Sequence, residues 1–101
     1  MKKIVIIPAF NESKVIIDTI NDIRAKAPDF DFVVVNDHSK DDTHRLLARE
    51  GIPALNLPVN LGIGGAVQTG YLYAYRNGYD IAVQLDGDGQ VVAPDCPQGL
   101  E

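Results

Sequence analysis

Residues 4–12 have the sequence IVIIPAFNE, a short apolar run that ends in polar residues. A continuous run of β-branched residues is typical of a strand that is buried on both faces of a parallel sheet. Beyond this run the apolar residues recur at spacings of four, three and four, as on one face of a helix. The residues with this spacing are Ile16, Ile20, Ile23 and Ala27. The stretch therefore predicts a buried strand followed by a helix that packs on the sheet.

The same alternation continues along the chain. Further strands are predicted at 32–35, 52–57 and 81–85, with helices between them, the last over 61–77. Right-handed crossovers then place helices on both faces of a parallel sheet. We predict an α/β three-layer sandwich, a Rossmann-like parallel sheet in the order 3-2-1-4, with its switch point between the first and fourth strands. In the last helix we expect four large residues to face inward: Val67, Tyr71, Leu72 and Tyr75.

Composition excludes several classes of protein. The chain has 101 residues, which is typical of one domain, and 9 basic against 14 acidic residues give a net charge of -5. Without a basic cluster, nucleic-acid binding is disfavoured. The single cysteine, Cys96, excludes an internal disulfide and fits a reducing compartment, so we expect a cytoplasmic protein. No apolar run reaches the roughly 20 residues that a membrane-spanning helix requires.

Residues 91–101 differ in character from the rest of the chain. They contain Pro94, Pro97 and Gly99 and have neither a helical nor a strand period. We predict one folded unit over 1–90 and an irregular tail over 91–101, whose last residues resemble a cloning remnant. The outer edge of strand 81–85 would then be unpaired, so we expect a chain that is cut short and self-associates through this edge. Tyr71 and Tyr75 provide a second candidate contact between subunits.

Polar residues follow each predicted strand. Asn11, Asp37 and Asn60 come after the first three strands, and Asp86 and Asp88 follow the fourth. Each residue alone is typical of a turn or a helix cap. Ligands of parallel α/β sheets, however, bind beyond the carboxyl ends of the strands, and all four strands carry the pattern. We therefore predict a binding site along this edge.

The segment Asp86-Gly87-Asp88-Gly89-Gln90 is the most specific of these signals. Two carboxylates separated by a glycine present oxygen ligands of the kind that Mg²⁺ and Mn²⁺ prefer. An acidic turn is the structural alternative. An EF-hand is rejected because Val91 and Pro97 stand where a glycine and a glutamate are required. Aspartyl-phosphate enzymes and receiver domains are rejected because no acidic pair follows the first strand.

The glycines and histidines have plainer interpretations. Gly62, Gly64 and Gly65 match neither a dinucleotide fingerprint nor a Walker loop, and we expect them to let a helix N-terminus pack closely on the sheet or on a ligand. His38 and His44 have no cysteine or histidine partners at zinc-site spacing, so we expect surface residues.

Four motifs together resemble one enzyme family. They are IIPAFNE at 6–12, VVNDHS at 34–39, NLGIGGA at 60–66 and LDGDGQ at 85–90. In this order they resemble the inverting family 2 glycosyltransferases of GT-A fold, and most nearly the dolichol-phosphate mannosyltransferase-like branch. The resemblance covers residues 2–90. It implies a truncated GT-A fold that binds a nucleotide sugar, linked to UDP or GDP.

The resemblance also implies roles for individual residues. The nucleotide would lie against residues that follow the first, second and fourth strands: Pro8, Phe10, Glu12, Val35, Asp37, Asp86 and Gly87. A divalent cation, Mg²⁺ or Mn²⁺, would be held against the diphosphate by Asp86, Asp88 and Gln90, the two aspartates forming the family's DXD motif. Such a cation offsets the charge that grows on a leaving diphosphate.

One departure from the family pattern sets the expected activity. Family members continue after the DXD motif with His-Asp-Pro or a similar segment, whereas Val91-Val92-Ala93 follows here. The base and the acceptor half, for a lipid phosphate or a glycan, would lie beyond the chain end. We therefore expect a fragment that is inactive alone, from a parent protein at the cytoplasmic face of a membrane. The alternative is a non-catalytic α/β module that binds a nucleotide or assembles into a homo-oligomer.

Overall fold

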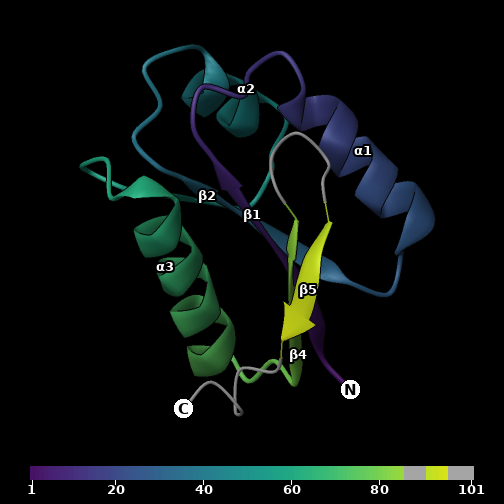
Figure 1. Ribbon diagram of the computed structural model, residues 1–101. Coiled ribbons are helices and arrows are strands. Elements are labelled where there is room, and N and C mark those ends of the chain that lie inside the picture. The colour runs from purple at the N-terminus through teal and green to yellow at the C-terminus, as the bar shows by residue number, and fades with distance from the viewer. Residues whose placement is uncertain (86–90, 96–101) are drawn as a thin grey trace.

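The computed structural model describes residues 1–85 and 91–95 (Figure 1). Strands and helices alternate along the chain, as the sequence predicts, and one further strand follows. The elements are β1 (Lys3–Ala9), α1 (Ile16–Lys26), β2 (Asp31–Asn36), α2 (Thr43–Arg49), β3 (Ala54–Asn56), α3 (Gly62–Arg76), β4 (Ile81–Leu85) and β5 (Val91–Asp95).

The strands form one sheet in the order β3-β2-β1-β4-β5. β1 pairs in parallel with β2 and with β4, and β2 pairs in parallel with β3. The predicted order 3-2-1-4 is therefore confirmed. Because these four strands run in the same direction, their carboxyl ends lie along one edge of the sheet, which we call the carboxyl edge.

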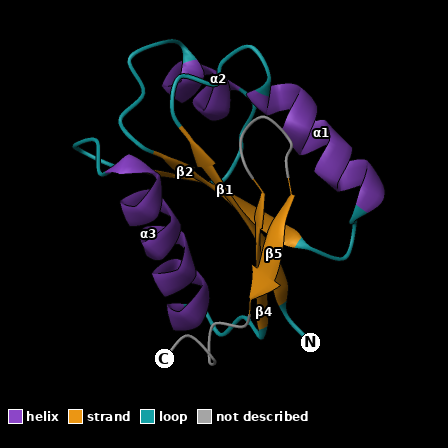
Figure 2. Ribbon diagram, in the orientation of Figure 1, coloured by secondary structure: helices purple, strands orange, loops and turns teal. Residues whose placement is uncertain are grey.

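Two apolar clusters, one on each face of the sheet, make the three layers (Figure 2). Alternate residues of a strand point to opposite faces. Val5 and Ile7 of β1 accordingly belong to the cluster that includes residues of α1 and α2, whereas Ile4 and Ile6 belong to the cluster beneath α3. All four side chains are buried. The unbroken apolar run of β1 is thus explained by burial on both faces.

The face of α3 that meets the sheet differs from the predicted one. Its buried residues are small: Ala66, Gly70 and Ala74. Leu72 and Tyr75, which were expected inside, are exposed, and Tyr71 is half-buried. The reason is a close approach of helix and sheet, since a Cβ added at Gly70 would overlap Cγ2 of Ile6. Large side chains do not fit between these two backbones, so the small residues turn inward.

The segment after β4 also corrects the prediction. Residues 91–95, expected to be irregular, form β5, which pairs antiparallel with β4. The register places Val83 opposite Pro94 and Ala82 opposite Asp95. Proline lacks the N–H that a ladder bond requires, but it is tolerated on an edge strand, and β5 is the outermost strand. The expected open edge of β4 is therefore wrong, while self-association itself stays a prediction.

Candidate functional site

Loops after β1 and β2 are joined by hydrogen bonds at the carboxyl edge (Figure 1). The main-chain N–H of Asn11 donates to Oγ of Ser39 at 3.1 Å, and the N–H of Lys40 donates to Oδ1 of Asn11 at 2.8 Å. Asn11 has a φ of 55°, in the left-handed region that asparagine adopts more readily than most residues. The two loops therefore hold each other in a defined conformation.

Asp37, the first residue after β2, is a buried carboxylate at this edge. It is 3% exposed, and its N–H donates to the carbonyl of Ala9 at 2.9 Å, extending the β1–β2 ladder by one bond. Its Oδ1 accepts the N–H of Leu61 at 2.6 Å, and its carbonyl accepts Nδ2–H of Asn60 at 3.1 Å. Asp37 is thus fixed both by β1 and by the loop that leads from β3 to α3.

Asp41 organises the start of α2. Partial desolvation raises its pKa, but hydrogen bonds from Thr43 and Ser13 outweigh this effect and lower the pKa of Asp41 to about 2. Thr43 donates through both its main-chain N–H, at 3.0 Å, and its hydroxyl, while the N–H of Ser13 donates to Oδ2 at 3.3 Å. Asp41 therefore stays ionised at neutral pH and is a second tie between the loops after β1 and β2.

Glycine is required at two positions near the start of α3, for different reasons. Gly62 has a φ of 77°, which favours glycine, and its N–H donates to Oδ1 of Asn60 at 3.1 Å. A Cβ at Gly65 would meet the side chain of Leu61 at 2.6 Å, whereas one at Gly64 would meet nothing within 4 Å. Gly65 is thus explained by a contact with the residue that precedes α3, and Gly62 by its backbone conformation, while the predicted packing of this helix end on the sheet or on a ligand stays a prediction.

With this geometry in view, comparison with known proteins gives the family. A model of the family described as glycosyl transferase family 2 matches residues 4–101. The chain belongs to glycosyl transferase family 2.

Two curated relatives illustrate the range of this family. The UDP-N-acetylglucosamine–dolichyl-phosphate N-acetylglucosaminyltransferase of Methanococcus voltae is 35% identical over 113 residues, which cover 95% of this chain and 45% of the relative. The undecaprenyl-phosphate mannosyltransferase of Micrococcus luteus is 31% identical over 106 residues, which cover 100% of this chain and 44% of the relative. The family 2 chain described here thus spans less than half the length of these relatives.

Solved structures of nucleotide-sugar enzymes share the fold. Staphylococcus aureus TarS 1-349, in complex with UDP, is 25% identical with a TM-score of 0.74 over 87% of this chain and 28% of that one. The mannosyltransferase PcManGT of Pyrobaculum calidifontis, in complex with GDP-Man and Mn²⁺, is 23% identical with a TM-score of 0.76 over 86% of this chain and 27% of that one. This family 2 chain has the Rossmann-like core of a GT-A fold.

The predicted nucleotide-binding residues differ in how deeply their side chains are buried. Pro8 and Val35 are paired in register and buried, and the Val35 side chain lies in the core beneath α3. Phe10 is 41% exposed, and Glu12 is half-buried, in the loop after β1. The structure therefore brings Phe10, Glu12 and Asp37 to one edge and places the Val35 side chain in the core.

The predicted metal ligands lie outside the described residues. Asp86, Gly87, Asp88 and Gln90 follow β4, which ends at Leu85 next to β1 in the sheet. Among residues 1–85 and 91–95, no group of three or more His, Cys, Asp or Glu side chains has an arrangement that could hold a metal ion. The metal site predicted at Asp86, Asp88 and Gln90 therefore stays a prediction.

Sequence reasoning missed the polar residues that hold the loops together. Asn36, Ser39 and Asn56 were not assigned roles, yet the carboxamide of Asn36 bonds to both of the others. The available signal was the type of residue, since asparagine and serine at strand ends bond readily to nearby backbone. Their partners across the sheet, however, depend on the register of β2 and β3.

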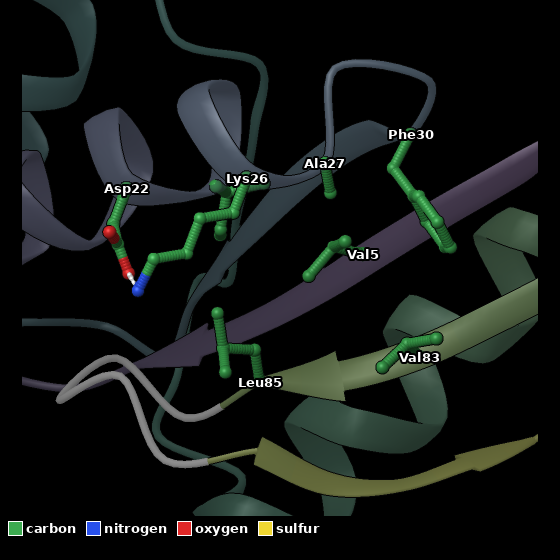
Figure 3. Close-up of a pocket in the computed structure, with 8 residues that line it drawn as sticks. Val5, Asp22, Lys26, Ala27, Phe30, Val83 and Leu85 are labelled. Carbon is green, nitrogen blue, oxygen red and sulfur yellow. Dashed lines mark ion pairs between the residues drawn. The ribbon is translucent and has the colours of Figure 1, made fainter.

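The described part of the chain also has a hollow of about 290 Å³, which extends to Leu85 at the carboxyl end of β4 (Figure 3). It lies between α1 and the sheet and is lined chiefly by apolar side chains, including Val5, Phe30 and Leu85. An ion pair between Lys26 and Asp22, at 3.2 Å, borders it. The two charged residues of this lining, Lys26 and Asp22, are paired with each other, and the other described lining residues are apolar, so we do not assign the nucleotide to this hollow.

No helix within the described residues is long and apolar enough to cross a membrane.

Proposed function

We propose that this chain forms the nucleotide-binding half of a transferase that moves a sugar from a nucleoside diphosphate to a lipid phosphate or glycan. One observation carries the proposal: a buried carboxylate, Asp37, is fixed at the carboxyl edge beside the switch point between β1 and β4. This is the place where open parallel α/β sheets bind their ligands. Membership of glycosyl transferase family 2 supports the same conclusion.

Asp37 would recognise the base. The N–H of Leu61 donates to Oδ1, and among the described residues no hydrogen-bond donor reaches Oδ2. Oδ2 would accept an N–H of uracil or guanine, because a carboxylate that is already oriented pays little additional cost for ordering. Phe10, exposed on the loop after β1, would pack against the base or ribose. Pro8, Glu12 and the main chain of Val35 would complete the site, with Asp86 and Gly87 on the side of the diphosphate.

Asp86, Asp88 and Gln90 would hold Mg²⁺ or Mn²⁺. Two carboxylates and an amide are oxygen ligands that suit these hard cations, so the residue types fit the group. The cation would act as a Lewis acid that stabilises the leaving diphosphate. The described side chains would orient the nucleotide: Asp37 would fix the base and so place the diphosphate toward the end of β4. PcManGT, a structural neighbour, was solved with GDP-Man and Mn²⁺.

The acceptor would be bound by parts of the protein other than those described. The relatives named above act on dolichyl phosphate and undecaprenyl phosphate, and this chain covers 45% and 44% of their lengths. A catalytic base would come from that remaining length. We therefore propose that this chain binds the donor nucleotide but transfers no sugar alone.

Calorimetry tests the proposal with UDP and GDP, each with and without Mn²⁺. We expect one of them to bind, and to bind more tightly with Mn²⁺. Asp88→Asn should remove the effect of Mn²⁺, while the matched control Asp29→Asn, in the exposed turn before β2, should keep it. Failure of both nucleotides to bind would refute the nucleotide site, and equal affinity with and without Mn²⁺ would refute the metal site.

A further inference from the structure

We propose that Asn36 is a positioning residue of the nucleotide site, one that holds the loops after β1, β2 and β3 in the arrangement in which Asp37 meets the base. This role rests on the proposed function, because it concerns how the proposed ligand Asp37 is placed. Asn36 directly precedes Asp37 in the sequence but is not itself proposed to contact the nucleotide.

The side chain of Asn36 connects two of the loops directly. Asn36 is the last residue of β2 and is 3% exposed. Its Nδ2–H donates to Oδ1 of Asn56, at the end of β3, at 3.1 Å. Its Oδ1 accepts both the N–H of Ser39 at 3.2 Å and the hydroxyl of Ser39 at 2.5 Å. A single carboxamide therefore joins the end of β3 to the loop after β2.

Ser39 extends the connection to the loop after β1. Its Oγ donates to Asn36 and accepts the main-chain N–H of Asn11 at 3.1 Å. The hydrogen-bonded chain thus runs from Asn11 through Ser39 and Asn36 to Asn56, and crosses the ends of three adjacent strands. We call these four residues the amide chain. Asn36 is the buried member of this chain, so its bonds are the ones best shielded from water.

The main chain of Asn36 fixes the turn that carries Asp37. Its carbonyl accepts the N–H of His38 at 2.9 Å and the N–H of Leu57, in the loop after β3, also at 2.9 Å. His38 has a φ of 58°, a left-handed conformation that is held here by the bonds on either side of it. Because Asp37 lies between Asn36 and His38, rotation of this turn would move its carboxylate.

These contacts separate a positioning role from a binding role. The oxygen of the Asn36 carboxamide already accepts two hydrogen bonds and the amide donates to Asn56, so the buried side chain acts within the protein. Loss of the amide chain should therefore weaken nucleotide binding through misplacement of Asp37. It should leave the dependence on Mn²⁺ unchanged, because the proposed metal ligands lie after β4.

Paired substitutions at both ends of one hydrogen bond test this role. Asn36→Leu removes every bond of the side chain and should weaken affinity for UDP or GDP, measured by calorimetry with Mn²⁺, by about tenfold. Asn36→Asp should rescue most of it, because Asn56 can turn its amide to donate to the new carboxylate. Asn56→Asp alone should be nearly neutral, since it still offers an acceptor. The double substitution Asn36→Asp with Asn56→Asp should again lose about tenfold, because two carboxylates then face each other.

A control at the other end of the sheet separates this effect from general loss of stability. Asn77 donates from Nδ2 to the carbonyl of Tyr73 at 2.8 Å, near the end of α3. Asn77→Leu removes a comparable bond and should leave nucleotide affinity unchanged. Melting curves of every variant establish that the affinities are those of folded protein. If Asn36→Leu does not fold, Ser39→Ala breaks the same chain at a half-buried link and should weaken affinity several-fold.

The outcomes are distinct. Absence of nucleotide binding by the unmodified chain would overturn the proposed function, and this role with it. Binding by the unmodified chain that folded Asn36→Leu or Ser39→Ala leaves unchanged would overturn the positioning role alone. The positioning role would be established by three results together: weaker nucleotide binding in Asn36→Leu, nearly normal binding in Asn36→Asp, and weaker binding again in the double variant.

Discussion

The two ends of the sheet are both closed by side-chain bonds, but they are built from different residues. At the amino end, the hydroxyl of Tyr79 donates to Oδ2 of Asp31 at 2.6 Å, and the Lys2 ammonium lies 4.5 Å from the centre of the Tyr79 ring. The N–H of Lys2 also donates to Oδ2 of Asp80 at 2.8 Å. These are long side chains that reach across the sequence and join the start of the chain to β2 and β4.

The carboxyl edge uses short side chains and strained turns instead. The amide chain joins three loops, and two residues there, Asn11 and His38, have a positive φ. Left-handed residues cost free energy and persist where their surroundings hold them. The comparison indicates that both ends are held by hydrogen bonds, and that the carboxyl edge also holds two left-handed residues in a fixed arrangement of loops around Asp37.

The largest effect on stability is expected between the two ends, where α3 packs closely on the sheet. Gly70→Ala would place a Cβ against Ile6 and should lower the free energy of unfolding by about 1–3 kcal/mol, the usual cost of overpacking. Gly64→Ala is the matched control, because nothing lies within 4 Å of its added Cβ. It should raise stability by up to about 1 kcal/mol through helix propensity. Urea unfolding that gave both variants the same stability would contradict the close approach of α3.

Tyr79→Phe tests the amino end. Loss of the hydroxyl bond to Asp31 should lower the free energy of unfolding by about 1 kcal/mol and leave nucleotide affinity unchanged. Burial, with the neighbouring Asp31 carboxylate, raises the pKa of Tyr79 from 10.0 to about 12. Since the folded-state pKa is the higher one, the contribution is complete below pH 10 and is lost as the pH rises toward 12. Thermal melts of Tyr79→Phe should therefore lack part of the alkaline decline; an identical decline in both proteins would refute this assignment.

Asp41→Asn tests the carboxyl edge and has the smallest expected effect. Its pKa is lowered to about 2 in the folded chain, against an ordinary value of 3.8. The contribution to stability is therefore present above about pH 4 and is lost as the pH falls through 2. Melting temperatures of Asp41→Asn should fall less steeply than those of the unmodified chain between pH 4 and pH 2. Equal slopes would mean that the bonds from Thr43 and Ser13 do not favour the ionised carboxylate.

Much of this architecture follows from patterns in the sequence. The apolar runs of β1 and β2 predict buried parallel strands, and the order 3-2-1-4 follows from their alternation with helices. The gathering of Phe10, Glu12 and Asp37 at one edge follows from strand direction alone. Each of these features depends on the period of the sequence near the residue concerned, which is visible without knowledge of distant contacts.

The features that were missed depend on contacts between distant residues. The inward face of α3 was wrong because the size of its residues was taken as a sign of burial, whereas the distance between helix and sheet selects Ala66, Gly70 and Ala74. β5 was missed because an edge position, which tolerates Pro94, cannot be recognised before the sheet is assembled. The amide chain required the register of β2 against β3, which pairs Asn36 with Asn56.

The most direct test of the nucleotide site is the affinity of Asp37→Asn for UDP and GDP, measured by calorimetry with Mn²⁺. The new amide keeps an oxygen for the N–H of Leu61, so the loop should stay in place, but the second position becomes a donor and repels a base N–H. We predict that affinity falls by about tenfold or more, while the melting temperature changes little and Asp29→Asn binds as the unmodified chain does. Unchanged affinity in a folded Asp37→Asn protein would contradict the assignment of Asp37 to the base.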